Sequence, residues 1–139
     1  MRDLVREVIA PFRAAEGRAK RFTIEGENIR LSPKATLALG MAFNELAANA
    51  VKYGALSNDA GTISIKWTME AKSDCRWLCL HWRETGGPLV TVPKRKGFGS
   101  RLIEQGLAHE LEGKIKLEFP PEGVVCTIFV PAPRAVLDG

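Results

Sequence analysis

Three groups of residues in this chain have side chains and spacings that could bind a flat, anionic ligand. The first group is a polar stripe, because Glu45, Asn49 and Lys52 lie four and three residues apart and would share one side of a helix. A stripe of this kind is equally typical of the solvated face of a surface helix. The surrounding segment is rich in alanine, which makes the helix slender and would let another group approach closely.

The other two groups are glycine pairs. Gly86-Gly87 would let the backbone come near a flat ligand, and the carboxylate of Glu84 beside it could accept a hydrogen bond from the exocyclic amine of a base. Gly97-Phe98-Gly99-Ser100 precedes a predicted helix, whose free N–H groups would favour phosphate. Both have ordinary explanations too, because many loops need glycine for turning and carboxylates at strand ends are usually solvated.

Hydrophobic periodicity and turn residues predict the elements that must position these groups. Serine and proline at positions 32 and 33 are typical of a helix start, and Gly54 is typical of its end. The predicted helices cover residues 2–15, 32–53 and 100–111. The predicted strands cover residues 21–25, 62–69, 77–82, 114–119 and 124–130.

Hairpins outnumber possible crossovers in this order of elements. The sequence therefore predicts an α+β fold, a two-layer α/β sandwich in which helices pack on one face of a mixed, mostly antiparallel sheet. A chain of 139 residues is long enough for one core. We expect one domain over residues 1–133 and a frayed tail over residues 134–139.

Composition argues against several classes of function. The net charge is only +4, and the basic run Lys94–Lys96 is short, whereas a nucleic-acid binder would carry a basic stripe with aromatic residues. No stretch reaches the roughly 20 apolar residues of a membrane span. The cysteines at positions 75, 79 and 126 are typical of buried thiols in a reducing cytoplasm, not of a zinc site. We expect a cytoplasmic domain that contacts neither nucleic acid nor membrane.

The order of the motifs resembles that of the GHKL ATPases with the Bergerat fold, and among them the HWE-type sensor histidine kinases. Residues 44–57 read N-E-L-A-A-N-A-V-K-Y-G-A-L-S, which is similar to the N box of that family. Trp82-Arg83-Glu84 matches its W-x-E signature, Gly86-Gly87-Pro88 follows as in the family, and residues 97–103 read G-F-G-S-R-L-I. The resemblance covers about residues 2 to 133. The family histidine before the N-box glutamate is Asn44 here, which leaves the ATP-site motifs unbroken.

This resemblance implies the catalytic domain of a bacterial protein histidine kinase in two-component signalling. Such a domain binds ATP with Mg²⁺ and transfers the γ-phosphate to a histidine. We expect that histidine on a separate dimerisation and phosphoacceptor domain, because His81 and His109 are expected to be structural or surface residues. A response regulator would be the downstream partner, and the isolated domain would be a monomer.

The same resemblance implies a role for individual residues. Asn49 would bind Mg²⁺ through its amide oxygen, and Glu45 would be the catalytic residue that orients a magnesium-bound water or assists the nucleophile. Glu84 would read the adenine, and the basic run would lie on a short ATP lid. Further ATP contacts would come from Lys52, Tyr53, Gly86, Gly87, Lys96, Gly97, Phe98, Gly99, Ser100 and Arg101.

Two other functions stay open. Asn44 and the lack of an acceptor are compatible with a degenerate GHKL module that senses nucleotide or scaffolds a partner without transferring phosphate. A serine kinase acting on an anti-sigma antagonist, or a free ATPase, would share the fold, but the short lid and the W-x-E string argue against this alternative.

Overall fold

The computed structural model describes residues 1–13, 21–58, 60–72, 75–88, 102–131 and 135–137. The helices are α1 (Arg2–Arg13), α2 (Pro33–Lys52), the π-helix η2 (Leu102–Leu107) and α4 (Ala108–Leu111). The strands are β1 (Phe22–Gly26), β2 (Ile29–Leu31), β3 (Thr62–Lys72), β4 (Cys75–Thr85), β5 (Lys114–Glu118), β6 (Val125–Pro131) and β7 (Ala135–Leu137).

The long helix α2 begins and ends where the sequence predicts. The Ser32 side chain accepts a hydrogen bond from the Ala35 backbone N–H at 3.1 Å, and Pro33 occupies the first helical position. At the other end, the N–H of Gly54 donates to the carbonyls of Asn49 and Ala50. One side of the helix is buried, as the apolar periodicity indicates, and this side includes Leu39, Phe43, Leu46 and Ala50.

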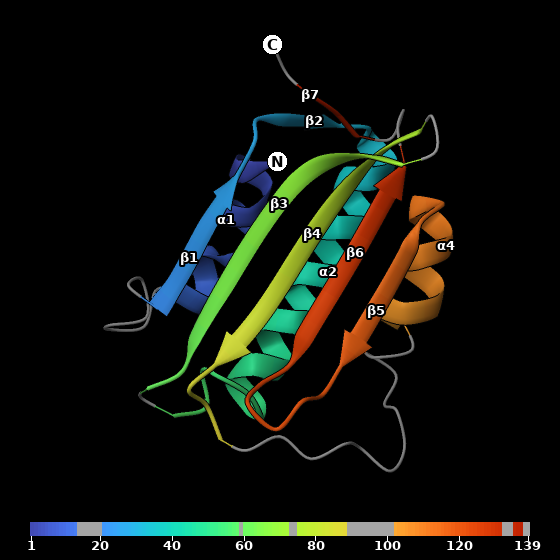
Figure 1. Cartoon of the computed structure of the whole chain (residues 1–139). Coiled ribbons are helices and arrows are strands. Elements are labelled where there is room, and N and C mark those ends of the chain that lie inside the picture. Colours follow the sequence, from blue (N-terminus) through green and yellow to red (C-terminus); the bar gives the residue numbers. More distant parts are fainter. Residues whose placement is uncertain (14–20, 59, 73–74, 89–101, 132–134, 138–139) are drawn as a thin grey trace.

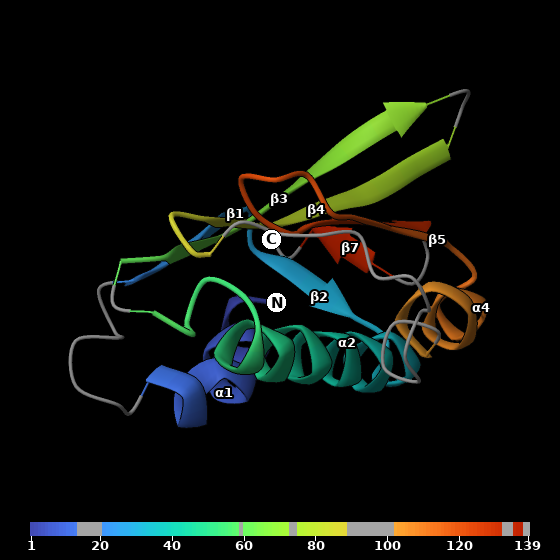
Figure 2. The ribbon, with the colours of Figure 1, turned by 90° about the horizontal axis from the view of Figure 1, so that it is seen from below.

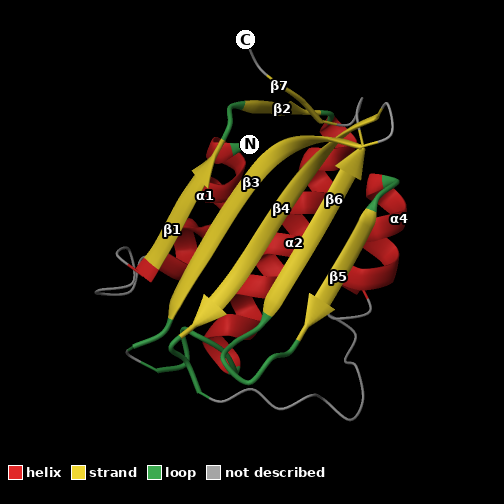
Figure 3. Ribbon diagram, viewed as in Figure 1, coloured by secondary structure: helices red, strands yellow, loops and turns green. Residues whose placement is uncertain are grey.

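A five-stranded sheet with the order β1-β3-β4-β6-β5 forms the second layer. Strand β1 runs parallel to β3, and the pairs β3–β4, β4–β6 and β5–β6 are antiparallel. Helices α1, α2 and α4 lie on one face of this sheet (Figure 2). The predicted mixed, mostly antiparallel sheet with helices on one face is therefore confirmed, and Figure 3 shows the two layers by type of element.

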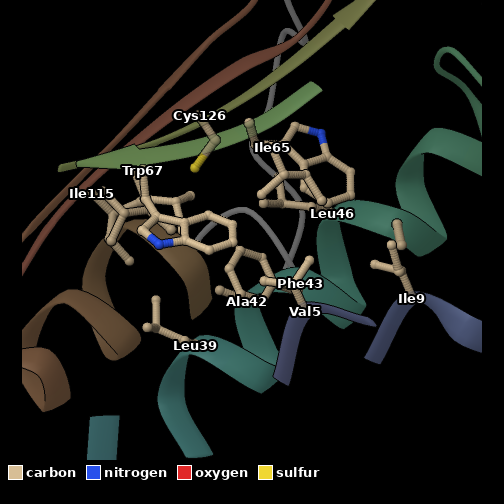
Figure 4. Packing of buried hydrophobic residues seen from close by; sticks show 14 of the residues in the cluster. Val5, Ile9, Leu39, Ala42, Phe43, Leu46, Ile65, Trp67, Ile115 and Cys126 are labelled. Carbon is tan, nitrogen blue, oxygen red and sulfur yellow. The ribbon is translucent and has the colours of Figure 1, made fainter. Parts of the chain in front are cut away.

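The core lies between α2 and the sheet, and strand periodicity selects the residues that enter it. Ile63, Ile65 and Trp67 are buried on the helix-facing side of β3, as their alternation predicts. Figure 4 shows Trp67 and Ile65 beside Phe43 of α2. Most alanines of α2 are buried as well, so the slenderness of the helix serves close packing within the domain.

Two short strands were not predicted. β2 pairs with β7 in antiparallel register, and Figure 1 places this second sheet across one end of the domain. β7 falls within the segment expected to be a frayed tail, so that expectation is wrong for Ala135–Leu137. Strands of three residues are too short for alternation to reveal them. The domain boundary after residue 133 stays a prediction.

The third predicted helix also differs from its prediction. From residue 102 it is the π-helix η2, and α4 then covers four residues. It ends before Gly113, as expected, with Glu112 at a φ of 55°. Among the described residues, no helix has both the length and the apolar character needed to cross a membrane.

Candidate functional site

The end of α2 and the end of β4 lie together at one end of the domain (Figure 1). The turn at Gly54 and Ala55 follows α2, and Glu84 stands near the end of β4. The turn between β5 and β6 also reaches this place, because the Glu84 backbone N–H donates to the Val124 carbonyl at 2.9 Å. The fold thus brings the end of the helix that carries the polar stripe to the same end of the molecule as the glycine pair Gly86-Gly87.

Glu84 is a buried carboxylate, with 3% of its surface exposed. One of its oxygens, Oε1, accepts a hydrogen bond from the Ala55 backbone N–H at 2.9 Å. The other, Oε2, accepts from the Trp82 indole N–H at 3.0 Å. The solvated carboxylate that is usual at a strand end is therefore not what the structure contains.

Burial determines the protonation behaviour of this group. Desolvation raises the pKa of Glu84 above its ordinary value of 4.5, and the hydrogen bonds from Ala55 and Trp82 lower the pKa and offset part of this effect. Among the described residues, Ala55 and Trp82 donate to this carboxylate, and because its two oxygens have about four lone-pair positions, its chemistry allows a further hydrogen bond from a ligand.

Glycine is needed where the two segments meet. A Cβ atom at position 54 would overlap Oε1 of Glu84, so only glycine lets the carboxylate reach the Ala55 N–H. Gly86 has a φ of +75°, which favours glycine, and it directs the chain back toward the α2 end. A Cβ at Gly87 would lie 2.7 Å from the Ala55 Cα. In the structure, these glycines therefore allow the turn after α2 to pack closely against the end of β4, which is an approach between two segments of the chain and not of a ligand.

The predicted polar stripe occupies successive turns of α2. Glu45 and Asn49 are half-buried, Lys52 is exposed, and Tyr53 is 76% exposed just beyond the helix. Within the described part of the chain, the side chains of Glu45 and Asn49 make no hydrogen bond or ion pair. A carboxylate and an amide oxygen are therefore available to a ligand along the C-terminal half of α2, the helix that leads into the Gly54–Ala55 turn.

The second glycine group cannot be placed in the same way. Residues Lys96, Gly97, Phe98, Gly99, Ser100 and Arg101, like the rest of the basic run, lie outside the described residues. The roles proposed for them rest on the sequence alone.

Sequence analysis missed two residues that shape this end of the domain. The Arg21 guanidinium donates to the carbonyls of Ala55, Asn58 and Gly61. The Asn58 side chain accepts from the N–H groups of Ala60 and Gly61 and donates to the Gly86 carbonyl at 3.3 Å. Asparagine in a Gly-containing turn is a usable signal, whereas nothing in the sequence pairs an arginine with carbonyls 34 to 40 residues away.

The remaining titratable candidates lie elsewhere. His81 is exposed on β4, where its ring nitrogens are 3.4 Å from Cys79 Sγ and from Thr127 Oγ1. His109 is exposed on α4. Both histidines lie on the surface, which agrees with the expectation that they are structural or surface residues, and the expected burial of the Cys79 and Cys126 thiols is confirmed.

Comparison with curated proteins shows close sequence relatives. The chain is 42% identical to a blue-light-activated histidine kinase of Brucella ovis over 132 residues, which are 94% of the chain and 26% of the relative. It is 39% identical to a protein of the same name from Brucella anthropi over 123 residues, 88% of the chain and 25% of the relative. The chain thus spans about a quarter of the length of these relatives. No known family profile matches it.

Solved structures share the fold. The histidine kinase domain of the Erythrobacter litoralis EL346 blue-light-activated histidine kinase superposes with a TM-score of 0.65 at 14% identity, over 91% of this chain and 58% of that one. The catalytic domain of the histidine kinase ThkA gives 0.65 at 21% identity, over 94% and 92%. ThkA in complex with the response regulator TrrA gives 0.58 at 18% identity, over 94% and 40%.

We predict opposite effects for two glycine substitutions near and on α2. Gly54→Ala should lower the free energy of unfolding by about 2 kcal/mol, because its Cβ displaces the Glu84 carboxylate. Gly40→Ala is the matched control: its Cβ would lie 3.7 Å from Leu4 Cδ1, an ordinary contact, and alanine should stabilise the helix by about 0.5 kcal/mol. Urea unfolding of both variants measures the difference, and equal effects would contradict the close approach.

We also predict a pH-dependent contribution of Glu84 to stability. Its raised pKa means that the folded state holds this proton more tightly than the unfolded state. The stabilisation of the folded state by protonated Glu84 is complete below the pKa that this group has in the unfolded state. It is lost as the pH rises through the pKa of Glu84 in the folded state. The unfolding free energy of the unchanged chain, minus that of Glu84→Gln, should therefore fall over the pH range above the ordinary pKa of 4.5. Urea unfolding across this range would show it, and a constant or rising difference would refute it.

Proposed function

This chain belongs to the histidine kinase family, and we propose that it is an ATP-binding catalytic domain that transfers the γ-phosphate of ATP to a histidine on a separate domain. The observation that carries the proposal is the junction of α2 with the end of β4. There the buried Glu84 and the turn at Ala55 join the W-x-E motif to the helix that bears Glu45 and Asn49. The relatives in Brucella, which match 94% and 88% of this chain, are named blue-light-activated histidine kinases.

The base of the nucleotide is proposed to lie at Glu84. A carboxylate can accept a hydrogen bond from the exocyclic amine of adenine, and its low-dielectric surroundings strengthen that bond. Gly87 packs against Ala55 and Gly86 lies against Ala60 and Gly61, and neither glycine places a side chain between the loop and a flat ring. Tyr53, which is largely exposed, would border the nucleotide.

The phosphates are proposed to lie along α2. Mg²⁺ prefers hard oxygen ligands and keeps several waters, so the half-buried amide of Asn49 suits it. Glu45, one helical turn earlier, would be the catalytic residue that orients a water on that ion or assists the incoming nucleophile. Lys52 is exposed one turn further along and would meet phosphate charge. From sequence alone, we assign Gly97 to Ser100 to the second glycine box, Lys94 to Lys96 to the lid, and Arg101 to the phosphates.

The chemistry that bound Mg²⁺ and ATP would supply is phosphoryl transfer, in which the protein mainly positions groups and stabilises charge. The phosphoacceptor would be a histidine on dimerisation helices outside this chain, because His81 is exposed on the face of β4 opposite to Glu84 and His109 is exposed on α4. A response regulator would act downstream, by analogy with the ThkA–TrrA complex. We propose a cytoplasmic, monomeric catalytic domain over residues 1–133.

Asn49→Ala should abolish or strongly weaken binding of ATP in the presence of Mg²⁺, because it removes the proposed metal ligand. We expect the dissociation constant measured by calorimetry to rise at least about tenfold. Asn44→Ala is the matched control, since Asn44 is an exposed amide on another side of the same helix and should leave the constant unchanged. Unaltered binding by Asn49→Ala would remove this residue from the metal site.

Phosphate transfer can be tested in trans. With labelled ATP and a matching phosphoacceptor domain supplied as a separate protein, the chain should form acid-labile phosphohistidine on that domain. Glu45→Gln should slow the transfer by about a hundredfold, which is typical of a lost acid–base group, with little change in ATP affinity. ATP binding without transfer would favour a degenerate nucleotide-binding module, which the exposed Asn44 in place of the family histidine makes worth testing. Acid-stable phosphate on a serine of a partner would favour the serine kinase.

A further inference from the structure

We propose that Arg21 is a positioning residue that shapes the base end of the nucleotide site and thereby supports discrimination for adenine. This inference rests on the proposed function. Arg21 directly precedes β1, the edge strand of the main sheet, and belongs to none of the ATP-site motifs. Its side chain is partly buried beneath the segment that follows α2, here called the 55–61 loop, of which the structure describes residues 55–58 and 60–61.

Three short hydrogen bonds connect Arg21 to this loop. Its Nε donates to the Gly61 carbonyl at 2.6 Å. Its Nη2 donates to the Ala55 carbonyl at 2.6 Å and to the Asn58 carbonyl at 2.7 Å. All three acceptors belong to the main chain, so the guanidinium determines the path of the loop backbone.

Arginine suits this place for a physical reason. Three carbonyl oxygens that converge on one point repel one another unless a cation with several donors lies between them. The planar guanidinium offers donors in a fixed fork, and each bond to a charged donor is stronger than a neutral one. Without it, partly buried carbonyls would lose their donors, and the loop would have to open to water.

The 55–61 loop transmits the position of Arg21 to the predicted base site at three points. Ala55 accepts from Arg21 through its carbonyl and donates through its N–H to Glu84 Oε1. Asn58, whose carbonyl is also held, donates through its side chain to the Gly86 carbonyl. Gly87 packs directly on the backbone of Ala55. Displacement of the loop would therefore move or free the Glu84 carboxylate and the glycine pair together.

The phosphate end of the site should be insensitive to this displacement. Glu45 and Asn49 lie within α2, whose own backbone hydrogen bonds hold them. The expected defect is thus a loss of base discrimination. Adenine presents an amine to a carboxylate, whereas guanine presents a carbonyl oxygen at the same ring position, which a fixed carboxylate repels. If the Glu84 carboxylate is displaced, it repels the guanine carbonyl oxygen less strongly.

Calorimetry with Mg²⁺-ATP and Mg²⁺-GTP tests this inference in the whole chain. Arg21→Gln should raise the dissociation constant for ATP about tenfold and that for GTP much less, so that the ratio of the two constants narrows toward one. Arg21→Lys keeps the charge but cannot reach three carbonyls at once, so it should give an intermediate ratio even where Arg21→Gln folds poorly. Arg76→Gln, an exposed arginine at the other end of β4, is the matched control and should keep both constants.

The binding stoichiometry separates positioning from a general loss of fold. A partly unfolded sample lowers the stoichiometry for both nucleotides and leaves the ratio of constants as it was. Both Arg21 variants binding with the unchanged ratio would overturn the inference, whether or not stoichiometry falls. Failure of the unchanged chain to bind Mg²⁺-ATP at all would instead overturn the proposed function, and this inference with it.

Discussion

The buried carboxylate of Glu84 is the constraint on which the rest of this domain depends. Removing an ionisable group from water is costly unless donors replace the lost solvent. Here the donors are the Trp82 indole and the Ala55 backbone N–H, which come from the core and from the turn after α2. To supply them, the turn must have no Cβ at Gly54, and the end of β4 must lie directly against it. One side chain therefore couples the hydrophobic core to the candidate nucleotide site.

This arrangement explains the spacing of Trp82 and Glu84 in the W-x-E motif. Residues two apart on a strand point to the same face, so Trp82 and Glu84 both point from β4 toward α2. Trp82 also stacks on Phe43 of α2, with ring centroids 6.4 Å apart and an interplanar angle of 20°. The other buried indole, Trp67, donates instead to the Glu27 carbonyl at 2.7 Å. Each indole N–H needs a partner when buried. Only that of Trp82 has a carboxylate, and this carboxylate lies in the candidate site.

The fold and the candidate site are stabilised by different kinds of interaction. Structures at 14% to 21% identity superpose over more than nine-tenths of the chain, because a helix layer on one face of this sheet tolerates many apolar side chains. The site end tolerates far less. Its bonds run between named donors and acceptors on segments that are distant in sequence, and each glycine contact there is made to backbone or to Glu84. Within the described residues, the packed core can therefore accept many apolar side chains, whereas the site end requires particular donors, acceptors and glycines.

The sequence by itself determined the features that depend on near neighbours. The cap and stop of α2, the alternation of β3, the polar stripe and the family motifs were all predicted, because periodicity and capping act within a few residues. Only the tertiary structure decided the burial of Glu84, the Arg21 bonds and the pairing of β2 with β7. A strand-end carboxylate reads the same whether solvated or buried. A hydrogen bond to a main-chain carbonyl does not depend on the residue type of the acceptor, so the sequence does not indicate it. A three-residue strand is too short to show a pattern from which its distant partner could be predicted.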